Sequence, residues 1–334
     1  MTDHLLVSDV SETQLLARIF PLLPAGSATL VGPGDDAAVV RAPDGRFVVS
    51  TDVLVEDHHF RRAWSSGYDV GWRAAMQNLA DCAAMGARGS SLVVALVIPP
   101  DLEVAWVTEL ARGLADGCAR HGAAVVGGDL SGGERVVVAV TVHGDLDGRP
   151  PVLRSGARPG DVVAHAGVLG RSAAGLALLE AGRRGVAEEL VAAFLRPDPP
   201  LEAGVRAALA GATAMLDVSD GLVRDAGRIA AASSVFIDLD DPLVVLAEDV
   251  AALRPASEAL AADPLPWVLT GGEDHGMLAT FPHGTALPQG FRAIGRTRAA
   301  DSTGTVDDPA VPVPVTVRGF APTVHGGGWD HFAG

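Results

Sequence analysis

The sequence predicts a protein of class α/β (α+β) with two domains, and three observations support this prediction. With 334 residues, the chain exceeds the size at which one hydrophobic core usually keeps growing. Hydrophobic residues make up 48% of it and charged residues 20%, a composition typical of globular proteins. Short runs of β-branched residues alternate with stretches of helical spacing in both halves. We therefore expect an N-terminal and a C-terminal α/β domain.

The first half is expected to contain several strands and two helices. Runs of β-branched residues bounded by Gly, Pro and Asp predict strands over 28–40 and 46–56. Apolar residues at helical spacing in YDVGWRAAMQNLADCAAMGA predict a helix that ends at Gly86. Beyond it we expect the strand SLVVALVI, a helix up to about His121, and the strands AAVV and ERVVVAVTVHGDL.

Turn-forming residues from Asp145 to Asp161 predict the boundary between the domains, which we set at 1–150 and 151–334. In the second domain we expect strands at DVVAHAG, AMLDV, VFIDL, PWVLTGG, GMLATF, FRAIG and VPVTV. Helical spacing predicts helices over about 172–209, and another helix between AMLDV and VFIDL. Both halves are thus of mixed α/β type.

Composition and charge exclude several classes of function. The formal net charge is -16 at pH 7 and no basic run reverses it locally, so we expect no binding to nucleic acid or anionic membranes. The start lacks a basic leader region and LVVALVI is too short to span a bilayer, so we expect a cytoplasmic location. No lysine occurs, which rules out a lysine Schiff base and a P-loop lysine. Cys82 and Cys118 are expected to be reduced core thiols.

Acidic residues recur where predicted strands end in tight turns. These residues are Asp35, Asp36, Asp52, Asp129, Asp217 and Asp220, joined by Asp81 on a helix and by Glu273 and Asp274 after two glycines. Singly, each suits a helix cap or a turn. Gathered together, such carboxylates would repel one another and lose hydration unless cations lay between them. Oxygen ligands suit Mg²⁺ or Ca²⁺, so we interpret the pattern as a site where Mg²⁺ bridges carboxylates to substrate phosphates.

A glycine run, three histidines and an aromatic tail are less specific signals of function. The glycines of GVLGRSAAGL lack the G-x-G-x-x-G spacing, so a dinucleotide site is disfavoured. His58, His59 and His275 suit either a phosphate or substrate contact or a structural role. The aromatic residues of the tail GGGWDHF either tuck onto the domain, which we favour, or form a flap that stacks on a ring.

The motifs GDDAAVV, STDVLVEDHHF, NLADCAAMGA, GGDLSGG, LRSGARPGD, LDVSDGL, GGEDHG and GWDHF resemble, in this order, those of the thiamine-monophosphate kinase family. This family belongs to the aminoimidazole-ribonucleotide synthetase-like ATP-dependent superfamily. The resemblance implies direct in-line transfer of the γ-phosphoryl group of ATP to thiamine monophosphate, assisted by several Mg²⁺ ions, as the last step of thiamine diphosphate biosynthesis. It also implies a homodimer. Domain 1–150 would bind ATP and Mg²⁺ and join its strands to the partner's in a dimer-spanning barrel, and domain 151–334 would complete the active site.

The resemblance also implies roles for individual residues, none of them a covalent nucleophile. The implied metal ligands are Asp36, Ser50, Thr51, Asp52, Asp81, Asp129, Asp217 and Asp220. The implied ATP contacts are Gly128, Asp129, Arg154 and Ser219. The implied contacts to the thiamine substrate are His59, Glu273 and Trp329.

The sequence departs from the commoner family pattern at GGEDHG. A tyrosine and a glutamate usually follow the aspartate, and this chain has His275 and Gly276 there, while Glu273 is retained.

Two alternative functions stay open: another superfamily member, such as a selenophosphate or aminoimidazole-ribonucleotide synthetase, and a non-catalytic nucleotide-binding relative. A selenophosphate synthetase would be expected to carry a reactive cysteine near its N-terminus, and a hydrogenase-maturation relative to end in a cysteine; this sequence has neither.

Overall fold

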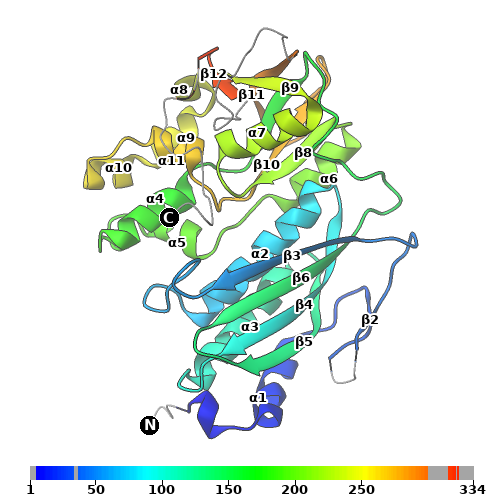
Figure 1. Ribbon diagram of the computed structural model, residues 1–334, viewed down its shortest axis with the longest axis vertical. Helices are drawn as coiled ribbons and strands as arrows, with labels where there is room; N and C mark the ends of the chain where they lie inside the picture. Colours follow the sequence, from blue (N-terminus) through cyan, green and yellow to red (C-terminus); the bar gives the residue numbers. More distant parts are fainter. Residues whose placement is uncertain (1–4, 34–36, 300–314, 321, 323–334) are drawn as a thin grey trace. The chain divides into compact units, whose positions relative to one another are not determined.

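The computed structural model describes residues 5–33, 37–299, 315–320 and 322, and the chain divides into two compact units (Figure 1). Unit 1 comprises Met1–Cys82 and Ala87–Gly148, and unit 2 comprises Ala83–Gly86 and Arg149–Gly334. Each unit contains a β-sheet together with helices, which confirms the mixed α/β class. The roles assigned to the two predicted domains stay a prediction.

Unit 1 is built on a four-stranded sheet in the order β3-β6-β4-β5. Its strands are β3 (Val48–Val55), β4 (Arg88–Ile98), β5 (Ala124–Gly132) and β6 (Val137–Asp145). Strand β4 runs parallel to β5 and antiparallel to β6, which in turn pairs antiparallel with β3. The other elements are η1 (Val7–Asp9), α1 (Glu12–Ile19), η2 (Phe20–Leu22), β1 (Thr29–Val31), β2 (Val39–Val40), α2 (Gly67–Ala84) and α3 (Val104–Ala119).

Helices α2 and α3 cover one face of this sheet (Figure 1). They pack closely at glycines, because a Cβ at Gly71 would come within 2.1 Å of the Leu110 carbonyl oxygen, and α2 is buried on nearly all sides. On the covered face Val140 is fully buried. On the opposite face Val49 and Val53 are 56% and 43% exposed. Among the described residues, helices therefore cover one face of this sheet, and the other face exposes apolar side chains.

Unit 2 contains a six-stranded sheet in the order β12-β9-β11-β7-β10-β8. Its strands are β7 (Val162–Ala166), β8 (Ala214–Val218), β9 (Val235–Leu239), β10 (Gly276–Phe281), β11 (Phe291–Ala299) and β12 (Val315–Val317). Its helices are α4 (Arg171–Glu180), α5 (Glu188–Leu195), α6 (Leu201–Leu209), α7 (Leu222–Ser233), α8 (Pro242–Val245), α9 (Ala247–Ala252), α10 (Arg254–Leu260) and α11 (Leu265–Thr270). Every residue of β10 is buried, so this strand lies in the core.

Two expectations about secondary structure need correction. PWVLTGG was expected to be a strand, and this prediction is wrong because Leu265–Thr270 forms helix α11. Prolines at the start of a helix cost no hydrogen bond, and Val268 and Leu269 are its buried side chains. The strand expected over 28–40 is reduced to the short β1 and β2. Within the part of the chain that the structure describes, no helix has the length and apolar character needed to cross a membrane.

Candidate functional site

In unit 1, the covered face of β3 brings Ser50 to Asp81 of α2. The Ser50 hydroxyl donates to Oδ2 of Asp81 at 2.6 Å. Asp52 shares this face with Ser50 because side chains alternate along a strand. Thr51 projects to the other face, where its hydroxyl accepts a hydrogen bond of 3.2 Å from Thr141. The structure thus separates Thr51 from the other three predicted metal ligands of this region.

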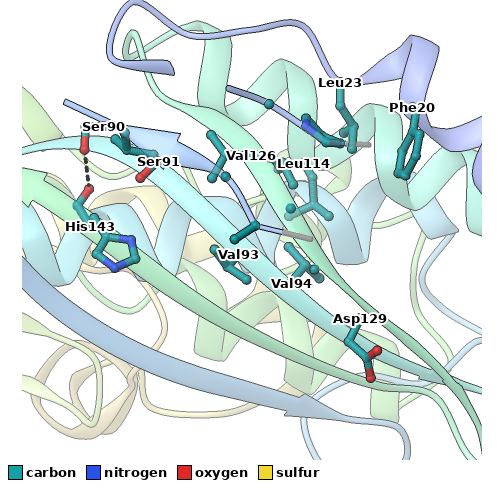
Figure 2. A pocket seen from close by; sticks show the side chains of 18 of the residues that line it. Phe20, Leu23, Ser90, Ser91, Val93, Val94, Leu114, Val126, Asp129 and His143 are labelled. Carbon is teal, nitrogen blue, oxygen red and sulfur yellow. Dashed lines mark hydrogen bonds between the residues drawn. The ribbon is translucent and has the colours of Figure 1, made fainter. Parts of the chain in front are cut away.

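Asp129 lies on β5 opposite Ala95, and Ala95 shares the uncovered face with Val53 through its pairing with Ala139. Because cross-strand neighbours share a face, the sheet separates Asp129 from the Ser50–Asp81 pair. Asp129 lines a cavity of about 820 Å³ in unit 1, most of whose lining side chains are apolar. Figure 2 shows it beside valines of β4 in this cavity.

Packing alone accounts for the glycine at position 128, which is the predicted ATP contact next to Asp129. A Cβ at this position would come within 2.0 Å of the carbonyl oxygen of Val94. At the neighbouring Gly127 a Cβ would meet nothing within 4 Å. The close approach of β4 therefore explains why position 128 is a glycine, and its contact with ATP stays a prediction.

In unit 2, the motifs SDG and GGEDHG form one folded site although they are far apart in the sequence. The N–H of Glu273 donates to the carbonyl of Ser219 at 2.9 Å, and the N–H of His275 donates to that of Val218 at 3.1 Å. A Cβ at Gly272 would come within 2.1 Å of the Ser219 oxygen, so only glycine permits this contact. Glu273 and His275 both have positive φ, at 70° and 52°, a conformation that side-chain-bearing residues rarely adopt.

This arrangement buries His275 against Asp217. Nδ1 of His275 is 2.9 Å from Oδ2 of Asp217, and Nε2 is 3.8 Å from Oε2 of Glu273. Burial alone would lower the pKa of His275, but its hydrogen bond with Asp217 and the charges of Asp217 and Glu273 raise it to about 10. The contact with Asp217 thus favours the protonated imidazole.

Asp220 is held by Arg228 of helix α7, with which it forms an ion pair. Arg228 also pairs with Asp225 at 2.5 Å, and Asp225 accepts hydrogen bonds from the N–H groups of Asp220 and Gly221, at 2.9 and 3.1 Å. Burial raises the pKa of Asp225 to about 6, although Arg228 opposes the shift. Sequence reasoning missed Asp225 and Arg228; their i, i+3 spacing just after SDG was the available signal.

The remaining predicted residues have structural contacts of their own. Nδ1 of His59 accepts a hydrogen bond of 3.0 Å from the N–H of Val55, which closes the turn after β3. The carbonyl of Arg154 accepts from the Ser233 hydroxyl at 3.1 Å. These contacts account for local structure, and the roles of His59, Arg154 and Ser219 in binding stay predictions. Asp36 and Trp329 lie outside the described residues.

The oxygen atoms of this region are chemically suitable ligands for Mg²⁺. Ser50 and Asp81 offer hydroxyl and carboxylate oxygens at hydrogen-bond distance, which are hard ligands of the kind Mg²⁺ prefers. Among the described residues, however, no group of three or more His, Cys, Asp and Glu side chains is placed to hold a metal ion. Three of the predicted acidic ligands instead have a local partner: Asp81 with Ser50, Asp217 with His275 and Asp220 with Arg228.

Comparisons with known proteins find similarity over most of the chain. Residues 34–146 match the family model "AIR synthase related protein, N-terminal domain". The chain is 52% identical to a thiamine-monophosphate kinase of Mycobacterium tuberculosis over 270 residues, covering 81% of this chain and 80% of that protein. It is 33% identical to that of Bacillus subtilis over 278 residues, covering 81% and 83%.

Solved structures show the same similarity. AaThiL complexed with AMPPCP and TMP matches with a TM-score of 0.74 at 31% identity, covering 89% of this chain and 91% of that one. The hydrogenase maturation protein HypE matches with a TM-score of 0.70 at 19% identity, covering 92% and 94%, which indicates a shared fold alone.

Proposed function

The chain belongs to the thiamine-monophosphate kinase family, and from this premise we propose that it transfers the γ-phosphoryl group of ATP to thiamine monophosphate, giving thiamine diphosphate and ADP. The observation that carries the proposal is its 52% identity, over 81% of the chain, to a relative that bears this name. The structural neighbour complexed with AMPPCP and TMP supports binding of ATP and thiamine monophosphate by the same fold. This reaction would be the last step of thiamine diphosphate biosynthesis.

We propose that the transfer is direct and in line, without a covalent protein intermediate. The second pKa of a phosphate monoester is about 6, so the acceptor is already largely ionised at neutral pH and needs little general-base help. Catalysis then depends on positioning two anions and on neutralising their charge. In unit 1 Ser50 and Asp52 share the face of β3 that meets Asp81 of α2, and in unit 2 Asp217 lies in β8 and Asp220 follows the end of that strand.

Carboxylate and hydroxyl oxygens on both faces of the sheet of unit 1 and in unit 2 suit several Mg²⁺ ions. The proposed ligands are Asp36, Ser50, Thr51, Asp52, Asp81, Asp129, Asp217 and Asp220. When bound, Mg²⁺ supplies charge neutralisation at the phosphates of both substrates. The chain has no lysine, so arginine side chains and backbone N–H groups are its other means of holding phosphate. Arg228, which pairs with Asp220 here, is one such side chain.

A direct assay tests the proposal. Purified protein is incubated with ATP, Mg²⁺ and thiamine monophosphate, and thiamine diphosphate is measured by chromatography beside coupled detection of ADP. We expect both products in equal amounts, and excess EDTA should abolish them. Folded protein that forms no thiamine diphosphate would overturn the proposal. Release of ADP with selenide or with an aminoimidazole-ribonucleotide precursor would then favour another superfamily member, and nucleotide binding without turnover would favour a non-catalytic relative.

A further inference from the structure

His275 lies between two residues to which the proposed function gives different roles. It contacts Asp217, a proposed metal ligand, at 2.9 Å, and its other ring nitrogen is 3.8 Å from Glu273, a proposed substrate contact. The three residues come from two motifs, and His275 is one that the family resemblance leaves without a role. We propose that His275 is a positioning residue that holds the metal-binding and substrate-binding carboxylates in one arrangement. This inference rests on the proposed function.

The backbone fixes the direction of the imidazole. The N–H of His275 donates to the carbonyl of Val218, directly after Asp217, so the two residues are tied together by backbone as well as by side chain. His275 keeps a positive φ of 52°, a conformation that persists in a non-glycine residue only where its surroundings hold it. A residue held there by its neighbours has its side chain aimed by the fold.

The two ring nitrogens are satisfied to different degrees. Nδ1 is hydrogen-bonded to Asp217, while Nε2 has no hydrogen-bond partner among the described residues, although His275 is only 5% exposed. Buried side-chain polar atoms are normally hydrogen-bonded, so Nε2 is the end of the ring that is open to a further contact. The nearest carboxylate to Nε2 is that of Glu273, which at 3.8 Å is too distant for a hydrogen bond. Nε2 is thus placed to fix Glu273 after a small movement of that side chain.

The neighbouring position 276 is closed to any side chain. A Cβ at Gly276 would come within 2.3 Å of Nε2 of His165 and within 2.7 Å of the Ala166 carbonyl oxygen. The glutamate of the commoner family pattern therefore has no room at position 276. Nδ1 engages only one oxygen of Asp217, so the other oxygen is free to bind a cation. Removing a group that orients a metal ligand in this way typically lowers metal affinity by about 10–100-fold.

Three variants separate the two contacts. An asparagine at position 275 places its amide nitrogen about where Nδ1 lies, and a glutamine places it about where Nε2 lies. Two quantities are measured: Mn²⁺ binding by electron paramagnetic resonance in the presence of AMPPCP, and KM and kcat for thiamine monophosphate. For His275→Ala we expect Mn²⁺ affinity to fall about tenfold or more and KM to rise. His275→Asn should restore Mn²⁺ affinity but not KM, and His275→Gln should restore KM better than Mn²⁺ affinity.

The control is His283→Asn, which removes an exposed histidine of the same unit and should change neither quantity. Thermal unfolding shows which variants are folded; if His275→Ala is not, the asparagine and glutamine variants carry the comparison. Equal loss in all three variants, or no loss, would overturn the inference, as would tighter Mn²⁺ binding, which would make His275 a competing cation. If the parent protein forms no thiamine diphosphate, the proposed function fails, while the Mn²⁺ measurement still tests the contact between His275 and Asp217.

Discussion

Aspartates of unit 2 show how one residue type serves different purposes within a small region. Asp217 is held by a histidine, Asp220 by an arginine, and Asp225 by backbone N–H groups and the same arginine. Asp274 accepts a hydrogen bond of 2.9 Å from the N–H of Ser172 in the first turn of α4. Only the first two were predicted as metal ligands. Asp225 orders the loop that carries Asp220, and Asp274 ties the 271–276 loop to the start of α4.

Asp274 gives a testable pH dependence. Burial raises its pKa to about 6 from an ordinary value of 3.8, although hydrogen bonds from Ser172 oppose the shift. The folded state therefore binds this proton more tightly than the unfolded chain. The resulting stabilisation is fully present below about pH 3.8 and is lost as the pH rises through 6. Asp274→Asn keeps an acceptor for Ser172 without the charge, so it should be about 1–2 kcal/mol more stable than the parent at pH 7.5.

Urea unfolding of parent and variant, at about pH 7.5 and about pH 5, measures this difference, which should shrink at the lower pH. Asp101→Asn, at an exposed position, is the matched control and should change stability little at either pH. An Asp274→Asn variant that is less stable than the parent at pH 7.5 would show that the charge itself stabilises the start of α4.

At the scale of elements, glycine positions separate packing from ligand binding. A Cβ at Gly128 would clash with the backbone of β4, while the adjacent Gly127 has open space, and neither has a positive φ. Gly128→Ala should therefore lower the free energy of unfolding by about 2 kcal/mol or more, and Gly127→Ala should change it by less than about 1 kcal/mol. Thermal unfolding and ATP binding by calorimetry are measured on both variants. Loss of ATP affinity in Gly128→Ala at unchanged stability would instead indicate a direct contact with ATP.

For the secondary-structure elements, the sequence could predict local turns but not the partners that distant strands bring together. Strand ends rich in Gly and Asp were recognisable because turn chemistry is local, and the loops at 217–221 and 271–276 indeed fold against each other. PWVLTGG was misread because a short apolar run fits a buried helix as well as a strand. The partners of the acidic residues were not predictable, since His275 lies 58 residues from Asp217 and only the pairing of β8 with β10 brings them together.

At the scale of the whole molecule, one face of the four-stranded sheet, which no described helix covers, is a candidate interface with another protein chain. Its apolar side chains include Val49 and Val53, at 56% and 43% exposure, on an edge strand that offers further hydrogen bonds. Exposed apolar surface of this kind marks association. We therefore predict a homodimer in which a second copy covers this face, as the family resemblance implies.

A charge on this face tests the dimer. Val53→Asp should shift the protein from a species of twice 34.1 kDa to one of 34.1 kDa in sedimentation equilibrium, because an unpaired carboxylate buried in an interface costs several kcal/mol. Val244→Asp, at a valine that is 72% exposed in unit 2, introduces the same change away from the sheet of unit 1 and should leave the dimer intact. A parent protein that is monomeric at micromolar concentration would contradict the prediction. If both variants dissociate, the effect comes from added charge and not from this face.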